Sequence, residues 1–362
     1  QINAYGVEAH SFVHWVAEVK LRWSYSQASL PTTVRGILND LRHWLASADR
    51  QLPDDAFPAL VYKCYHPDDL RILYLIREYV RQQVPDIALQ DLLKLALTDT
   101  LREAAAAGTG WPYISPRKNT GDKPAKGAFQ VFSQVVMRML VDLETVATKS
   151  STSTIVNRLG DARHQQALDD EQIDLSLTSP PYLNNYDYAD RTRLETYFWD
   201  LARTWGEISE KYRSQLIIAA TTQVKRSEHD VETVLTSDLQ HIAPDVYAQI
   251  QQAIMELSQR RLQKGGKKDY DLMTALYFND MLRVLEETYR VLKPTGAFCL
   301  VLGDSAPYGV HIQTDDLIAK IGLALGFREY TYVPLRTRGG KWKHNPQRHT
   351  VPLREGVVVL RK

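Results

Sequence analysis

Cysteine is almost absent from this chain of 362 residues, which contains only Cys64 and Cys299. Two cysteines exclude a disulfide framework and a four-cysteine zinc site. No other feature of the sequence points to a metal, and we predict no metal site. We expect both thiols to be inert core residues in a reducing cytoplasm.

Long hydrophobic runs and an excess of charge of one sign are missing too. The most apolar stretch, residues 296–303, suits one buried strand and is too short to span a bilayer. The first residues show no signal-peptide pattern, so we expect a soluble protein without a membrane partner. The net charge is +1, from 44 basic and 43 acidic residues. Any surface that binds nucleic acid must therefore come from local clusters of charge.

Periodicity predicts an α/β protein in which strands alternate with helices. The expected strands are residues 2–8, 155–159, 173–177, 297–302, 330–335 and 356–360. The expected helices are residues 11–23, 31–45, 68–107 with a break at Pro85, 129–148, 162–168, 192–205, 272–292 and 314–325. Such alternation is typical of a doubly wound sheet with helices on both faces. We assign the sheet core to 1–38, 150–206 and 272–362, with two mainly helical insertions at 39–149 and 207–271.

The most informative segment is the apolar strand 173–177, which runs directly into Thr178-Ser179-Pro180-Pro181-Tyr182. Ligands of open α/β sheets bind beyond the carboxyl ends of the strands, where this turn would lie. Prolines lack an N–H, so they leave backbone carbonyls as free acceptors, and the Ser179 hydroxyl can also accept from an amine. Tyr182 offers a flat face on which a base can stack. An ordinary strand-ending turn is the alternative interpretation.

This segment resembles motif IV of the DNA amino-methyltransferases, whose pattern is S/D/N-P-P-Y/F. The serine form is similar to that of the cytosine-N4 enzymes, whereas aspartate is commoner among adenine-N6 enzymes. Three further stretches resemble the family: motif II in Tyr5-Gly6-Val7-Glu8, motif III in Leu159-Gly160-Asp161-Ala162, and the helix-turn-strand after the catalytic loop in residues 291–302. The resemblance covers roughly the first forty residues and most of 150–362, and it is weak across both insertions.

The resemblance implies a Rossmann-like methyltransferase sheet and S-adenosylmethionine as cofactor. The implied activity is site-specific DNA methylation in a prokaryotic restriction-modification system, on the exocyclic amine of a flipped base, with cytosine N4 as the expected target. Ser179, Pro180, Pro181 and Tyr182 would be catalytic. No cysteine nucleophile is needed, and the Pro-Cys pair of cytosine-C5 enzymes is absent.

The resemblance also implies three cofactor contacts. Glu8 would bind the ribose hydroxyls, as an acidic residue at the end of a second strand does in nucleotide-binding folds. Asp161 would face the adenine amine, and Thr178 would lie beside the cofactor. A solvated strand-end carboxylate is the alternative for Glu8, and an ordinary Gly-Asp turn is the alternative for Asp161.

Substrate contacts are expected from residues that follow the turn and from two basic stretches interleaved with aromatics, 111–126 and 336–348. The residues after the turn are Asn184, Asn185, Asp187, Tyr188 and Arg191. Those in the basic stretches are Trp111, Arg117, Lys118, Arg336, Arg338 and Lys341. For any one of them, a capping loop or a solvated surface is an equally valid interpretation.

One motif of the family is missing, the glycine-rich F-x-G-x-G turn called motif I. Neither the glycines of 108–110 nor those of 265–266 follow a strand as that turn requires. We therefore predict that motif I lies upstream of Gln1 or comes from a second chain, and that these 362 residues alone bind cofactor poorly. Two alternatives stay open: an RNA base-amine methyltransferase, and a non-catalytic nucleic-acid-binding subunit.

Overall fold

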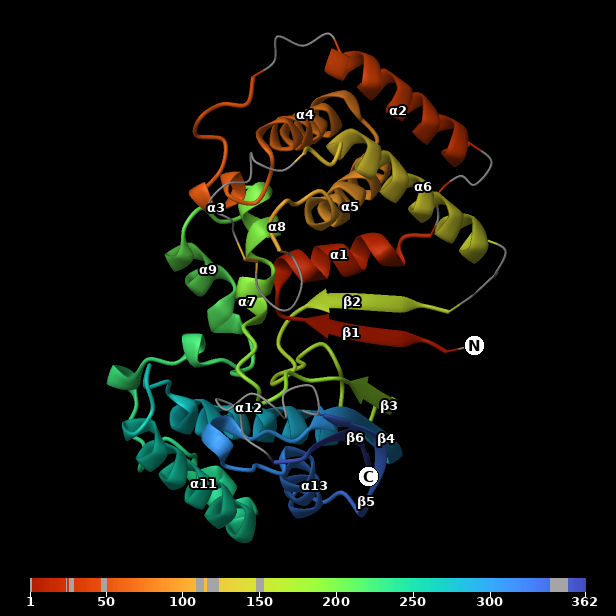
Figure 1. Ribbon diagram of the computed structural model, residues 1–362. Helices are drawn as coiled ribbons and strands as arrows, with labels where there is room; N and C mark the ends of the chain where they lie inside the picture. The colour runs from red at the N-terminus through yellow and green to blue at the C-terminus, as the bar shows by residue number, and fades with distance from the viewer. Residues whose placement is uncertain are drawn as a thin grey trace. The chain divides into compact units, whose positions relative to one another are not determined.

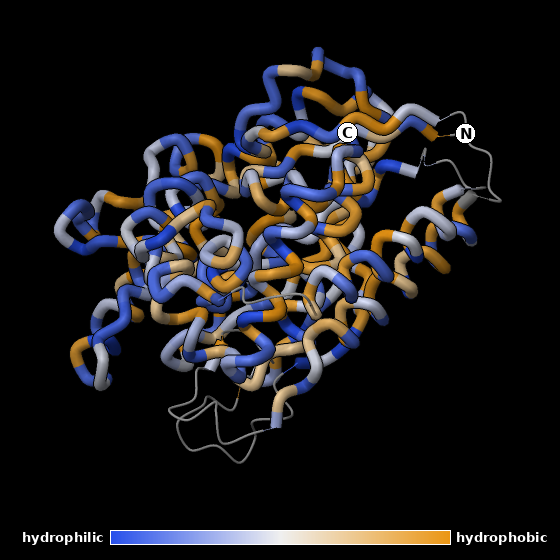
Figure 2. Tube along the Cα trace, turned by 90° about the horizontal axis from the view of Figure 1, so that it is seen from above, coloured by the Kyte–Doolittle hydropathy of each residue, from blue (hydrophilic) through white to orange (hydrophobic). Residues whose placement is uncertain are grey.

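The computed structural model describes residues 2–23, 25, 29–46, 51–108, 114–115, 124–147, 153–338 and 351–362. The chain forms two compact units (Figure 1). The first unit contains residues 1–159 and 188–212, and the second contains residues 160–187 and 213–362. Hydrophobic and hydrophilic residues are interspersed along the Cα trace (Figure 2), as expected of elements with one buried face.

The first unit has a small parallel sheet and a set of helices. Strands β1 (Ala4–Glu8) and β2 (Ile155–Leu159) pair from Ala4 opposite Ile155 to Glu8 opposite Leu159. Helix α1 (Ser11–Leu21) follows β1 and packs on both strands. The other helices are α2 (Leu30–Ala46), α3 (Ala59–Tyr62), α4 (Pro67–Gln83), α5 (Ile87–Glu103), α6 (Ala128–Ala147), α7 (Tyr188–Arg191), α8 (Arg193–Phe198) and α9 (Trp205–Lys211).

Helices α4, α5 and α6 begin where capping residues satisfy their first N–H groups. The Asp86 carboxylate accepts from the Leu89 N–H at the start of α5, and Pro67 occupies the first turn of α4. Asp69, buried in α4, accepts from the backbone N–H groups of Lys126 and Ala128 at the start of α6. One side chain of α4 therefore fixes where α6 begins.

The second unit is built on a four-stranded sheet with the order β3-β4-β6-β5. Its strands are β3 (Ile173–Thr178), β4 (Leu292–Gly303), β5 (Glu329–Arg338) and β6 (Leu353–Arg361). Strands β3 and β4 run parallel, and β6 runs antiparallel to both β4 and β5. The carboxyl ends of β3, β4 and β5 therefore lie at the same edge of the sheet as the start of β6.

Helices α12 (Tyr270–Val291) and α13 (Thr314–Ala324) pack on one face of this sheet (Figure 1). Helices α10 (Ser237–Ile242) and α11 (Pro244–Leu262) form a further layer on α12. The core between sheet and helices includes Phe298, Leu300 and Leu302, at alternate positions of β4. Gly326, at a φ of +112°, follows the end of α13 in a conformation that favours glycine.

The opposite face of this sheet carries apolar side chains that remain exposed. Leu175 and Leu177 of the edge strand β3 are 58% and 71% exposed, and Val333 of β5 is 44% exposed. Leu177 pairs with Cys299, so both point away from the face that α12 and α13 cover. The second unit thus has an open apolar face and an open edge along β3.

The predicted α/β class is confirmed. The described strands form two sheets, so the single doubly wound sheet and the five-part domain division both remain predictions. The helix predicted at 162–168 is wrong, because these residues form turns in which Asp161 binds the backbone N–H of Arg163. The helix predicted at 192–205 is also too long, since α8 ends at Phe198. Among the described residues, none of the helices has the length and apolarity needed to cross a membrane.

Candidate active site

The turn after β3 lies at the carboxyl edge of the second unit's sheet. Thr178 is the last residue of the strand and pairs with Leu300. Ser179 is exposed, Pro180 is buried and Pro181 is half-buried. Among the described residues, none donates a hydrogen bond to the carbonyls of Ser179, Pro180 or Pro181. These three carbonyls are therefore backbone acceptors without a donor in the part of the chain that the structure describes.

Tyr182 stands beside these acceptors and is half-buried. Its carbonyl accepts from the Asn184 N–H at 2.7 Å, and the fully buried Leu183 anchors the turn in the core. The guanidinium carbon of Arg338, at the end of β5, lies 5.2 Å from the centre of the Tyr182 ring. The structure thus brings together two parts of the predicted site that are far apart in the sequence.

Arg336, two residues before Arg338 on β5, binds the carboxylate of Glu355 on β6. Its Nε and Nη2 donate at 3.0 and 3.1 Å, and these hydrogen bonds raise the pKa of Arg336. The Arg336 side chain is nevertheless 69% exposed. Its predicted contact with DNA remains a prediction.

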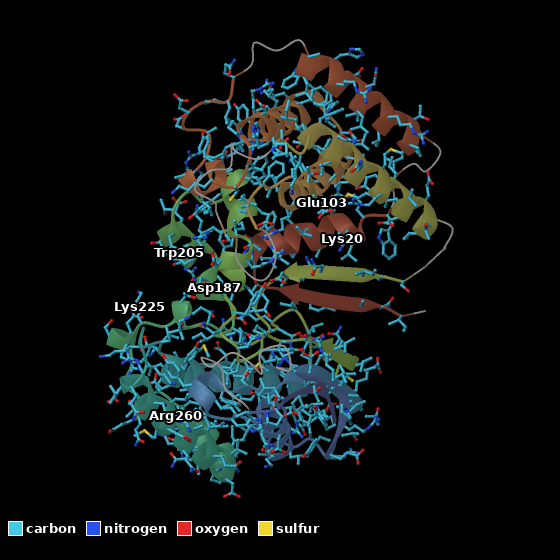
Figure 3. All side chains as sticks on the ribbon, viewed as in Figure 1. Lys20, Glu103, Asp187, Trp205, Lys225 and Arg260 are labelled. Carbon is cyan, nitrogen blue, oxygen red and sulfur yellow. The ribbon has the colours of Figure 1, made fainter. Side chains whose placement is uncertain are left out.

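Asn185 and Asp187 hold the loop that follows the turn. Asn185, at a φ of +62°, accepts from the Thr221 N–H at 2.8 Å and from the Thr221 hydroxyl at 3.0 Å. Asp187, labelled in Figure 3, is 2% exposed and accepts from Arg213 Nε at 2.9 Å and from the Thr222 hydroxyl at 2.7 Å. Both side chains therefore have structural partners, and their proposed contacts with a base remain predictions. Asn184 is exposed.

Asp161 also lies in the second unit, where it binds Arg163. Arg163 Nη2 donates to Asp161 Oδ2 at 2.7 Å, and its Nη1 donates to Asp280 at 2.8 Å. Burial opposes the charge of Arg163, but the hydrogen bonds to the two carboxylates outweigh it and raise the pKa of Arg163. The Asp161 side chain is 40% exposed, and its contact with the cofactor remains a prediction.

Glu8, Tyr188 and Arg191 belong to the first unit. Glu8 Oε1 accepts from the His10 N–H at 2.7 Å, just before the start of α1. Its second oxygen has no partner among the described residues and can accept from ribose hydroxyls. Tyr188 is 41% exposed, and Arg191 lies 3.8 Å from the Glu195 carboxylate.

Several predicted contacts cannot be placed in either unit. Trp111, Arg117, Lys118 and Lys341 lie outside the described residues. In the part of the chain that the structure describes, no group of three His, Cys, Asp or Glu side chains could hold a metal ion. Burial raises the pKa of Cys64 to about 12, so this thiol is protonated at neutral pH and is no nucleophile.

Comparison with known proteins finds relatives of this chain. The chain is similar to the Type II methyltransferase M.AvaI of Nostoc sp. (strain PCC 7120 / SAG 25.82 / UTEX 2576) and of Anabaena variabilis, each 29% identical over 195 residues. It is also similar to the Type II methyltransferase M.BsoBI of Geobacillus stearothermophilus, 25% identical over 213 residues. The chain is a relative of the Type II DNA methyltransferases. The family resemblance stated from motif IV is thereby confirmed.

The similarity covers part of each protein. The M.AvaI matches cover 52% of this chain and 38% of the relatives, and the M.BsoBI match covers 54% and 39%. The chain therefore spans about two fifths of the length of the curated methyltransferases it matches. No family model matches the chain. No solved structure matches it either.

The predicted contacts with S-adenosylmethionine remain predictions. The unused Glu8 oxygen suits a ribose diol. The glycine-rich turn that would wrap the methionine moiety is absent from the sequence. The outer edge of β3, where a further strand could pair, is open. That these residues alone bind the cofactor poorly also remains a prediction.

Sequence reasoning missed three residues near the turn after β3, at the carboxyl edge of the second unit's sheet. They are Gly303, Asp304 and Glu355. Asp304 is 1% exposed and accepts from His311 Nε2 and from the Arg354 N–H, both at 2.7 Å. The available signal was the position of Gly303-Asp304 directly after an apolar strand, where α/β sheets place their ligand-binding groups. Glu355 gave no such signal, because its partners lie on another strand.

Proposed function

We propose that this chain forms part of a Type II DNA amino-methyltransferase that modifies the exocyclic amine of a flipped base, with cytosine N4 as its target. The observation that carries the proposal is the set of unused carbonyls at Ser179, Pro180 and Pro181 beside the half-buried Tyr182. The related proteins are named Type II methyltransferases, and the resemblance of the turn to motif IV of the DNA amino-methyltransferases supports DNA as the substrate. An enzyme that modifies a prokaryotic chromosome acts in the cytoplasm.

Each part of the turn has a role in this proposal. The carbonyls and the Ser179 hydroxyl accept hydrogen bonds from the amine and keep its nitrogen in place. Tyr182 stacks against the base after the base has left the duplex. The amine is a weak nucleophile because its lone pair is delocalised into the ring, so positioning supplies much of the rate. S-adenosylmethionine, when bound, supplies the methyl group.

The open edge of β3 suits the missing part of the cofactor site. We propose that a strand carrying the glycine-rich turn pairs with this edge and that a helix covers Leu175 and Leu177, which are 58% and 71% exposed. This strand comes from residues upstream of Gln1 or from a second chain. With it, the sheet of the second unit would gain helices on both faces, as in a doubly wound fold.

Methyl transfer to genomic DNA tests the proposed function. The protein as its gene encodes it is incubated with labelled S-adenosylmethionine and DNA from a bacterium without modification, and nucleosides are identified by mass spectrometry. We expect N4-methylcytosine in DNA and none in structured RNA. Methylation of RNA alone would favour the RNA base-amine alternative. Sequencing of the product gives the recognition sequence.

Substitutions in the turn connect this activity to the candidate site. Tyr182→Ala should raise the KM for DNA about 5- to 150-fold, the equivalent of one lost stacking contact. Pro181→Ala should lower kcat by loosening the acceptor carbonyls. Lys225→Ala, on an exposed segment of the second unit (Figure 3), is the control and should match the wild type. Wild-type rates in both turn variants would contradict the assignment.

A non-catalytic nucleic-acid-binding subunit is the second candidate, favoured by the absent glycine-rich turn. Calorimetric titration with S-adenosylmethionine separates the two. We expect weak binding to residues 1–362 and tight binding once any upstream residues that the gene encodes, or the second chain, are present. Absence of binding in every form would favour the non-catalytic role.

A further inference from the structure

The guanidinium of Arg338 lies against one face of the Tyr182 ring and is held there by neighbouring strands. Its carbon is 5.2 Å from the ring centre, within the range of a cation–π contact. The Arg338 side chain is 21% exposed, so most of its surface is packed against protein. A planar guanidinium can stack on an aromatic ring in a way that a lysine ammonium cannot.

Two further contacts fix this guanidinium. Arg338 Nη1 donates to the carbonyl of Asp304 at 3.2 Å, and Nε lies 3.6 Å from Glu355 Oε2. Asp304 and Glu355 are both buried, and the Asp304 carboxylate is itself held by hydrogen bonds from His311 and Arg354. The partners of Arg338 are therefore rigid, and the position of the guanidinium is set from β4, β5 and β6.

Gly303 gives independent support for this arrangement. A Cβ added at Gly303 would lie 2.2 Å from Arg338 Nη1, far inside van der Waals contact. The guanidinium thus occupies the space that any other residue at 303 would fill. A side chain at this position would displace it from the Tyr182 ring.

We propose that Arg338 is a positioning residue for Tyr182. It covers one face of the ring and so directs the opposite face toward the target base. The inference rests on the proposed methylation of a flipped base, and it adds a residue outside the Ser179–Tyr182 turn to the groups that determine how the base is received. Arg338 acts through Tyr182 and not by contact with the reacting amine.

The role of Arg338 is tested by methylation kinetics on duplex DNA that carries the recognition sequence, once sequencing of the methylated product has given that sequence. Arg338→Met should raise the KM for DNA about 2- to 30-fold, as expected for one lost cation–π contact, and leave kcat close to the wild-type value. Arg338→Lys should restore little, because the ammonium cannot stack. Gly303→Ala should reproduce the effect although residue 338 is still arginine, because the added methyl group displaces the guanidinium. Agreement between the two variants guards against misfolding of one of them. Arg361→Met is the control, since it removes an exposed arginine of β6 that lies near Glu329.

A double-mutant cycle and a spectroscopic signal separate positioning from a general structural effect. In a Tyr182→Ala background, Arg338→Met should add nothing. The fluorescence of a 2-aminopurine at the target position should change on binding to the wild type, because the base exchanges its neighbours in the duplex for the Tyr182 ring, and this change should be smaller on binding to Arg338→Met. Additive effects in the cycle, or an unchanged KM and fluorescence in Arg338→Met, would overturn the inference while methylation itself stands. Failure of the wild type to methylate any DNA would overturn the proposed function and this inference with it.

Discussion

His10 of the first unit shows how burial sets the charge of a single residue. It is 2% exposed, stacks on Tyr212 with ring centres 4.4 Å apart, and has Nε2 2.8 Å from the Thr192 hydroxyl. Burial lowers the pKa of His10 to about 4. The ring is therefore neutral in the folded protein at pH 7, and its Nδ1 has no hydrogen-bond partner among the described residues.

This shift predicts a loss of stability in mild acid. The unfolded chain binds the His10 proton near pH 6.5, whereas the folded protein binds it only near pH 4. The contribution of His10 to the free energy of unfolding is therefore complete above pH 6.5 and is lost as the pH falls toward 4, by about 2 kcal/mol at pH 5.

Urea unfolding at pH 7 and pH 5 measures the effect. His10→Phe keeps a ring on Tyr212 and removes the titrating group, so its stability should fall less than that of the wild type between the two pH values. Equal losses in both proteins would show that other groups cause the acid sensitivity.

At the scale of single residues, the sequence is informative where the chemistry is local and uninformative where partners come from distant segments. Ser179, Pro180, Pro181 and Tyr182 are adjacent, and their shared suitability for an amine and a base is readable from the sequence. The partners of Asp187 are Arg213 and Thr222, which come from a later segment. Nothing in the local sequence shows that this carboxylate is buried and occupied.

At the level of elements, helices were predicted well where periodicity and a stop signal agree. The helix expected at 314–325 is α13, Thr314–Ala324, and Gly326 follows it. Strand order was not predictable in the same way, because β6 pairs between β4 and β5 through contacts distant in the sequence. The division of the strands between two sheets was likewise not visible in any local pattern.

Side chains on the two faces of the second unit's sheet should respond differently to substitution. Leu300 of β4 is fully buried under the helices, so Leu300→Ala should cost about 2–5 kcal/mol of unfolding free energy. Leu177 of β3 is 71% exposed, so Leu177→Ser should change the free energy of unfolding by less than about 0.5 kcal/mol.

Denaturant unfolding of residues 1–362 measures both variants. If a further strand and helix cover the open face in the complete protein, Leu177→Ser should become destabilising there. A large cost of Leu177→Ser in residues 1–362 alone would contradict the open face.

For the whole molecule, an incomplete cofactor site, as proposed above, would determine how the free energy of unfolding responds to S-adenosylmethionine. A ligand that binds only the folded state stabilises it by about 0.4 kcal/mol when its concentration equals Kd and by about 2.7 kcal/mol at a hundred times Kd. At a cofactor concentration near 0.1 mM, residues 1–362 should gain less than about 0.4 kcal/mol. The protein with the glycine-rich turn restored should gain several times more, as unfolding with and without cofactor would show. A large gain by residues 1–362 would mean that the described units already complete the site.

The open edge of β3 has a practical consequence for work with this chain. Its unpaired backbone groups, flanked by two solvent-facing leucines, form a template onto which a second molecule can add its own strand. Concentrated samples of residues 1–362 will tend to stack edge to edge and precipitate, and the tendency will rise with concentration. Dilute handling, or a charged residue placed at 175, preserves a monodisperse sample.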